Sequence, residues 1–79
     1  MLTSEALTRN LKKGCTGDDV KQLQETLLKL GYSLPKYGSD GKFGTETRAA
    51  VRAFQKAQGL TVDGVYGPAT HAVMVALVG

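Results

Sequence analysis

DGKFGTETRAAV at residues 40–51 and DGVYGPATHAVM at residues 63–74 share one pattern, and the architecture follows from it. When Asp40 is placed over Asp63, two glycines, an aromatic residue, a threonine and an alanine recur at the same positions, 23 residues later. A period that recurs inside a short chain indicates one supersecondary unit built twice. We therefore expect two copies of an Asp-Gly-x-aromatic-Gly turn, each leading into a helix.

Each copy has the chemistry of a turn that starts a helix. The Asp carboxylate can accept bonds from backbone N–H groups just ahead, and the Gly adopts conformations that are closed to other residues. Gly44 and Gly67 are the expected N-caps, and Pro68 suits a first helical position because its missing N–H would have no helical partner there. Apolar residues then recur at three- and four-residue spacing, which predicts helices over about 45–58 and 68–78.

A third apolar stripe, between residues 20 and 30, predicts the first helix. Gly31 is expected to end this helix, since glycine readily takes the left-handed conformation that often follows a helix. Thr16, with Asp19 three residues on, has the form of a capping box at its start. Together, the three segments predict an all-α fold, a small three-helix bundle.

Two glutamines, Gln24 and Gln55, each follow a core position on their helix. An amide at the edge of the buried face can bond the backbone of a neighbouring turn with both its donor and its acceptor. We interpret both side chains as structural rather than ligand-binding, and we expect Gln55→Ala to lose stability.

With 79 residues, the chain is long enough for one small domain with little core to spare. We assign residues 1–10 to a lead-in, where Ser4 could cap a short helical turn, and residues 11–79 to the domain. Hydrophobic residues make up 42% of the chain and charged residues 22%, as in an ordinary soluble module. The net charge of +3 suits either an acidic partner or a solvated surface. We find no signal-peptide pattern at the N-terminus and no stretch as long as a membrane span.

Catalytic and metal-binding patterns are missing from the sequence. Cys15 and His71 lie 56 residues apart, and we interpret them as a surface loop thiol and a partly exposed helical residue. Asp40 and Asp63 could supply paired carboxylates for glycoside hydrolysis, but the Asp-Gly turns already explain both. The last helix lacks the Arg, Asn and Gln side chains that read DNA bases. The sequence therefore predicts a domain without catalytic activity, cofactor, metal or nucleic-acid partner.

Three linked motifs resemble one family: VKQLQETLLKLGY at 20–32, DGKFGTETRAAVRAFQKAQGL at 40–60 and VDGVYGPAT at 62–70. From about residue 11 to 78 the chain is similar to the peptidoglycan-binding-domain-like family of small three-helix modules, which accompany bacterial and phage wall-lytic enzymes. The resemblance implies a non-catalytic, carbohydrate-binding role at the bacterial cell wall. It also implies an attached amidase, muramidase, peptidase or spore-cortex hydrolase, which the module holds on its polymer. The chain departs from the shortest family pattern by extra residues at 33–36.

Ligand-binding candidates lie around the two helix starts and in the long loop before the first Asp-Gly turn. Sugar faces pack on aromatic rings, whereas stem-peptide carboxylates suit basic side chains and the free N–H groups of a helix start. The residue types leave open whether sugar or stem peptide is bound. Phe43 and Tyr66 have a strong alternative role, in which each ring packs beneath its turn. The candidates are Tyr32, Tyr37, Asp40, Phe43, Arg48, Asp63 and Tyr66.

The nearly apolar last helix supports a different function. Apart from Thr70 and His71, its side chains are apolar all round, so it could pack on a partner domain. The chain would then be a protein-interaction module or a prodomain-like spacer that touches no glycan. Exposed apolar positions such as Val75 or Val78 would favour this alternative, and an exposed Tyr37 next to a groove would favour the wall binder.

Overall fold

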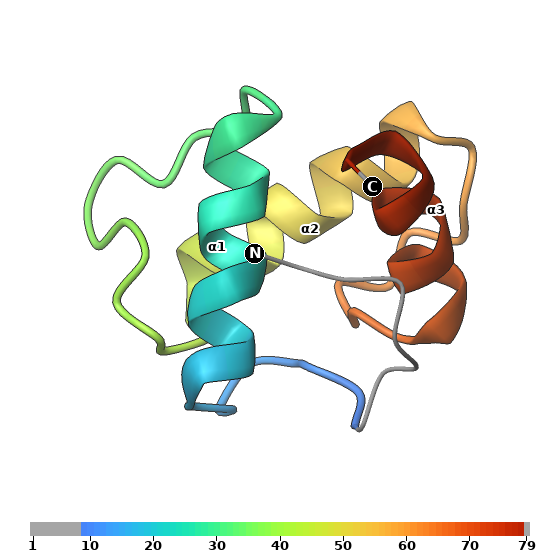
Figure 1. Ribbon diagram of the computed structural model, residues 1–79. Coiled ribbons are helices and arrows are strands. Elements are labelled where there is room, and N and C mark those ends of the chain that lie inside the picture. The colour runs from blue at the N-terminus through green and yellow to red at the C-terminus, as the bar shows by residue number, and fades with distance from the viewer. Residues whose placement is uncertain (1–8, 79) are drawn as a thin grey trace.

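The computed structural model describes residues 9–78, which form three helices joined by irregular segments (Figure 1). The helices are α1 (Asp18–Lys29), α2 (Thr45–Ala57) and α3 (Pro68–Val78), and α2 passes between the other two in Figure 1. The all-α, three-helix prediction is therefore confirmed. Most of the expected lead-in, including the turn at Ser4, lies outside the described residues.

The start of α1 differs from the predicted capping box. The N-cap is Gly17, at φ 137°, and no side chain caps the helix. Asp19 instead accepts a bond from Val20 N at 2.9 Å and forms an ion pair with Arg9, whose Nε lies 2.9 Å from Asp19 Oδ2. The prediction that Thr16 and Asp19 form a capping box is thus wrong, because the carboxylate is turned toward the guanidinium. The hydrogen bond from Arg9 lowers the pKa of Asp19.

The end of α1 matches the prediction for Gly31. Its N–H donates to Leu28 O at 3.0 Å, and the N–H of Tyr32 donates to Leu27 O at 2.9 Å. These two bonds form a Schellman motif, which requires the left-handed φ of 96° found at Gly31. The second helix ends in the same way at Gly59, so both helices turn back over their own last turn.

The core lies where the three helices and the two turns meet. Apolar residues from each helix fill it, together with the aromatic rings that precede α2 and α3. Tyr32 packs edge-on against Phe54, with ring centroids 5.9 Å apart. The buried apolar residues are Leu11, Val20, Leu23, Leu27, Leu34, Phe43, Ala50, Val51, Phe54, Tyr66 and Met74.

Gln24 on α1 fixes the first Asp-Gly turn. Its Nε2 donates to Lys42 O and Thr47 Oγ1, each at 2.9 Å, and to Asp40 Oδ1 at 3.2 Å. Its Oε1 accepts from Gly41 N at 2.8 Å. The side chain is completely buried, so these bonds replace all its contacts with water.

Gln55 on α2 fixes the second turn with the corresponding bonds and one more, from Asp63 N. Its Nε2 donates to Asp63 Oδ1 at 2.9 Å, Val65 O at 3.0 Å and Thr70 Oγ1 at 3.2 Å. Its Oε1 accepts from Asp63 N at 3.1 Å and Gly64 N at 3.0 Å. Both glutamines therefore have the structural role that the sequence predicts.

His71 and Cys15 are more enclosed than expected. His71 is buried, and its Nδ1 lies 2.7 Å from the hydroxyl of Tyr66. The prediction of a partly exposed histidine is wrong because the phenol beneath the second turn needs a polar partner inside the fold. Cys15 is half-buried against the core rather than a surface thiol, since the segment that carries it pairs with Phe43 across two backbone bonds.

Candidate functional site

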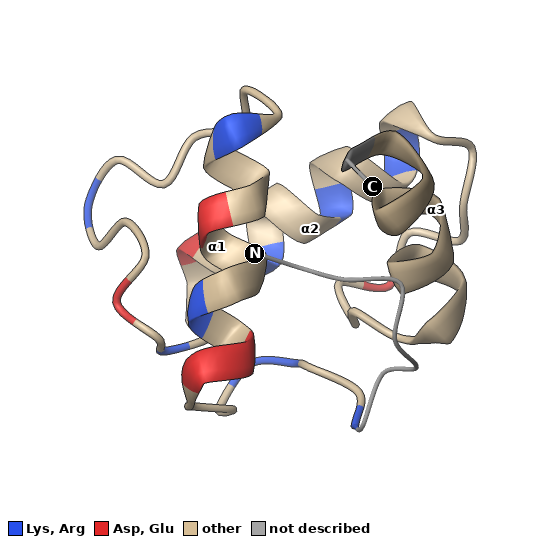
Figure 2. Cartoon of the chain, viewed as in Figure 1, with Lys and Arg blue, Asp and Glu red and all other residues tan. Residues whose placement is uncertain are grey.

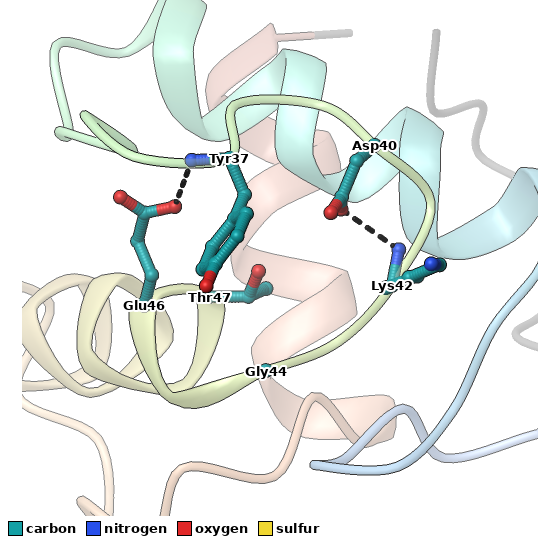
Figure 3. A pocket seen from close by; sticks show the side chains of 6 residues that line it. All are labelled: Tyr37, Asp40, Lys42, Gly44, Glu46 and Thr47. Atoms are coloured by element: carbon teal, nitrogen blue, oxygen red, sulfur yellow. Dashed lines mark hydrogen bonds between the residues drawn. The ribbon is translucent and has the colours of Figure 1, made fainter.

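The long loop before α2 closes against the start of that helix and forms a pocket of about 280 Å³ (Figure 3). We call it the first pocket. Two of its walls come from the loop and the Asp-Gly turn, and the third comes from the first turn of α2. Its lining residues are Tyr37, Asp40, Lys42, Gly44, Glu46 and Thr47.

Glu46 holds the loop in place. Its two carboxylate oxygens accept bonds from the backbone N–H groups of Lys36 and Tyr37, at 2.6 and 2.9 Å. Because both oxygens are engaged, this side chain shapes the wall of the first pocket rather than offering a free charge. Sequence reasoning missed this role, since a Glu in the first turn of a helix is already explained by the helix dipole.

Tyr37 stands at the edge of the first pocket with 60% of its surface exposed. Lys36 places its ammonium 5.3 Å from the centroid of this ring, within the range of a cation–π contact. An exposed aromatic ring on a backbone held by two charge-assisted bonds offers a fixed apolar face. Such a face can pack against the C–H groups of a sugar.

Of the two charged side chains in the first turn, Asp40 is held by hydrogen bonds and Lys42 is exposed. Asp40 Oδ1 accepts from Lys42 N at 2.9 Å, as Figure 3 shows, and also from Gln24. The bond from Lys42 N is the main cause that lowers the pKa of Asp40, so the carboxylate stays ionised. The side chain of Lys42 is exposed beside the pocket and can meet an anionic group.

The structure separates the seven candidate residues. Tyr37 and Asp40 line the first pocket. Phe43 and Tyr66 are buried, with 2% and 0% of their surface exposed, so their rings present no face to a ligand. The alternative role, packing beneath the turn, describes both rings.

The remaining candidates lie elsewhere. Tyr32 is half-buried against Phe54, and Asp63 belongs to the second Asp-Gly turn. Arg48 lies over that second turn, since a Cβ added at Gly64 would come within 2.9 Å of Arg48 Cγ. Sequence spacing cannot reveal this separation, because Arg48 is near the first turn in sequence and packs on the second.

Among residues 9–78, no three His, Cys, Asp or Glu side chains gather closely enough to hold a metal ion. Within the same described range, no helix is both long and apolar enough to cross a bilayer.

A small three-helix domain with a shallow pocket at a rigid turn belongs to the class of binding modules. The family model described as "putative peptidoglycan binding domain" matches residues 16–74, and the chain belongs to this family. Domains of this family occur as non-catalytic modules in wall hydrolases, and this chain is such a binding module rather than the catalytic part.

Relatives and solved structures agree with this assignment. The N-acetylmuramoyl-L-alanine amidase CwlL of Bacillus licheniformis is 54% identical over 67 residues, which cover 85% of this chain and 19% of that protein. The crystal structure of the SleB N-terminal domain superposes with a TM-score of 0.85 at 35% identity, covering 95% of this chain and all of that one. The Burkholderia AP3 phage endolysin gives a TM-score of 0.80 at 40% identity, covering 86% of this chain and 25% of that one. The chain thus spans about a fifth of the length of the amidases that it matches.

Proposed function

We propose that this domain binds bacterial peptidoglycan at the first pocket and holds an attached wall hydrolase on its polymer. The observation that carries the proposal is the exposed ring of Tyr37 beside a pocket whose backbone is already fixed. Tethering works by effective concentration, because a catalytic domain held near a repeating polymer meets more substrate without any change in its own chemistry.

The volume and the lining of the first pocket suit a small piece of the polymer. Its volume of about 280 Å³ is slightly below the usual range for ligand pockets, roughly 300–1,000 Å³, so it takes one sugar or a short peptide segment. Tyr37 supplies an apolar face, and Lys42 supplies a cation for a carboxylate. A single shallow site of this size predicts weak binding, about micromolar or weaker.

Co-sedimentation with purified peptidoglycan sacculi tests the proposal, at low and at high salt. We expect the domain to be retained at both, because packing on Tyr37 does not depend on charge. Tyr37→Ala should reduce retention severalfold, whereas Leu28→Ala, a matched control at a 42% exposed position on α1, should not. Equal retention of the two variants would remove the first pocket from the binding site. Loss of turbidity from the sacculi would overturn the non-catalytic assignment.

One observation favours docking on a protein partner as a second candidate function. Leu77 on α3 is 52% exposed, and Figure 2 shows no charged residue along this helix. Val75 is half-buried, and the side chain of Val78 is outside what the structure describes. Failure of the domain to sediment with sacculi at either salt concentration would favour this function over wall binding.

A further inference from the structure

A second pocket of about 320 Å³ lies at the other Asp-Gly turn, where α3 begins. We call it the second pocket. Its lining comes from the end of α2, the second turn, the first turn of α3 and the segment before Cys15. The lining residues are Asn10, Gln55, Leu60, Thr61, Asp63, Val65, Gly67, Pro68, Ala69 and Thr70.

The second pocket is built on the same frame as the first, namely an Asp-Gly turn and the start of the helix that follows it. Each of the six residues that line the first pocket has a counterpart in the second pocket 23 positions later. Three of the six positions keep the same residue, and these belong to the frame held by Gln24 or Gln55. The shared pairs are Asp40 and Asp63, Gly44 and Gly67, and Thr47 and Thr70.

The other three positions change in chemistry. An aromatic ring, a cation and an anion in the first pocket become three apolar side chains in the second. The changed pairs are Tyr37 and Leu60, Lys42 and Val65, and Glu46 and Ala69. The described lining of the second pocket therefore contains no cation. Its one carboxylate, on Asp63, is already bonded to Val65 N and to Gln55.

We propose that the second pocket is a separate subsite for the neutral N-acetyl group of a sugar, on the same polymer that the first pocket binds. This inference rests on the proposed function, and it assigns the two pockets different parts of that polymer. The first pocket, through Lys42, takes the part that carries stem-peptide carboxylates. The second pocket, whose one charged group is the already bonded Asp63, takes the acetylated sugar.

An acetamido group matches what the second pocket offers. The group has one N–H donor, one carbonyl acceptor and one methyl. The amide of Asn10 can both donate and accept, and its Oδ1 would lie 3.6 Å from a Cβ added at Gly67, which places it over the pocket. Leu60 and Val65 provide apolar contact for the methyl.

A carboxylate ligand does not match the second pocket. With Asp63 as the single charge in the described lining, a second anion would lose hydration and find no cation within that lining. A neutral group avoids this penalty. The frame also needs little reordering on binding, because the bonds of Gln55 fix the turn beforehand, and preorganisation favours affinity.

The probe is chitotriose, a neutral trimer of N-acetylglucosamine without stem peptides, titrated into the 79-residue domain and followed by backbone amide NMR. We expect shifts at the amides of Val65, Gly67 and Thr70, and these shifts should persist in Tyr37→Ala, which removes the sugar-packing ring of the first pocket. The deacetylated glucosamine trimer should produce no such shifts. Shifts confined to the first pocket, no shifts at all, or equal shifts with both trimers would overturn the inference.

A variant isolates the subsite. Ala69→Glu places a charged side chain in the second pocket, where the first turn of a helix tolerates a carboxylate. Ala72→Glu, at another exposed alanine of α3, is the matched control. We expect Ala69→Glu to weaken chitotriose binding at least fivefold and to reduce retention on sacculi, and we expect the control to bind as the wild type does.

The outcomes on sacculi separate the two proposals. If wild type and Ala69→Glu sediment equally while Tyr37→Ala does not, the proposed function stands and the second subsite is wrong. If the wild type fails to sediment at all, the proposed function itself is wrong. Thermal melts of each variant confirm that the loss of binding is not a loss of folding.

Discussion

Truncation of Gln55 to alanine tests the bonding that holds the second turn. The side chain is 1% exposed and makes five hydrogen bonds. Two of them, with Gly64 N and Thr70 Oγ1, are buried, whereas the other three are only partly buried. An unsatisfied buried polar group costs about 1–3 kcal/mol, so the two together predict a loss of roughly 3 kcal/mol, within a range of about 2–6.

This loss is large for so small a domain. A chain of this length has a free energy of unfolding of roughly 4–12 kcal/mol. A loss of about 3 kcal/mol should therefore leave the domain folded at 25 °C and lower its Tm by roughly 12–24 °C.

Urea unfolding followed by far-ultraviolet circular dichroism measures the effect. Gln58→Ala is the matched control, because it removes the same side chain from an exposed position directly after α2. Gln24→Ala should resemble Gln55→Ala, since Gln24 is equally buried and bonds the first turn. A loss below about 1 kcal/mol for Gln55→Ala, or a loss equal to that of Gln58→Ala, would refute the assignment of a structural role.

Three further predictions concern the turns and the core. Gly64→Ala should destabilise the domain more than Gly41→Ala in thermal melts. Both glycines have a left-handed φ, near 74° and 80°, and a side chain in that conformation costs about 1–2 kcal/mol. A Cβ at position 64 would also meet Arg48 Cγ at 2.9 Å, so equal losses for the two variants would contradict this contact. Burial raises the pKa of Tyr66, so its contribution to stability is complete below the ordinary value of about 10 and falls as the pH rises above it. Tyr66→Phe should therefore show a flatter stability profile than the wild type between pH 8 and 11, and parallel profiles would contradict the burial of the phenol. The bond from Val65 N lowers the pKa of Asp63, so its contribution is present at pH 7 and is lost as the pH falls below about 4. The deficit of Asp63→Asn in urea unfolding should accordingly shrink from pH 7 to pH 3, and a constant deficit would be evidence against an ionised carboxylate in the turn.

The fold was predictable because its signals are local. Apolar spacing, together with Gly31, Gly44 and Gly67 at the helix ends, identified the three helices within a residue or two. The roles of Gln24 and Gln55 could also be inferred, since each amide follows a core position and precedes a turn.

The site was less predictable, because it depends on the path of the loop. Glu46 bonds the backbone of Tyr37, nine residues earlier, and no spacing rule reports such a contact. Arg48 packs on a turn that is distant in sequence, and His71 is buried because Tyr66 lies beneath it. Proximity in sequence therefore indicates which residues are candidates, whereas tertiary packing determines which of them are exposed.

The repeated frame also explains why α3 differs from the helices before it. At the position that corresponds to Gln55 on α2, α3 carries Val78, which has no amide to hold a following turn. One residue earlier, Phe54 is fully buried in the core, whereas its counterpart Leu77 is 52% exposed. The domain therefore resembles a short stack of repeats in which α3 exposes Leu77, an apolar position that a repeat stack usually covers with its next unit or with a polar cap. A neighbouring domain that covered Leu77 would complete the stack.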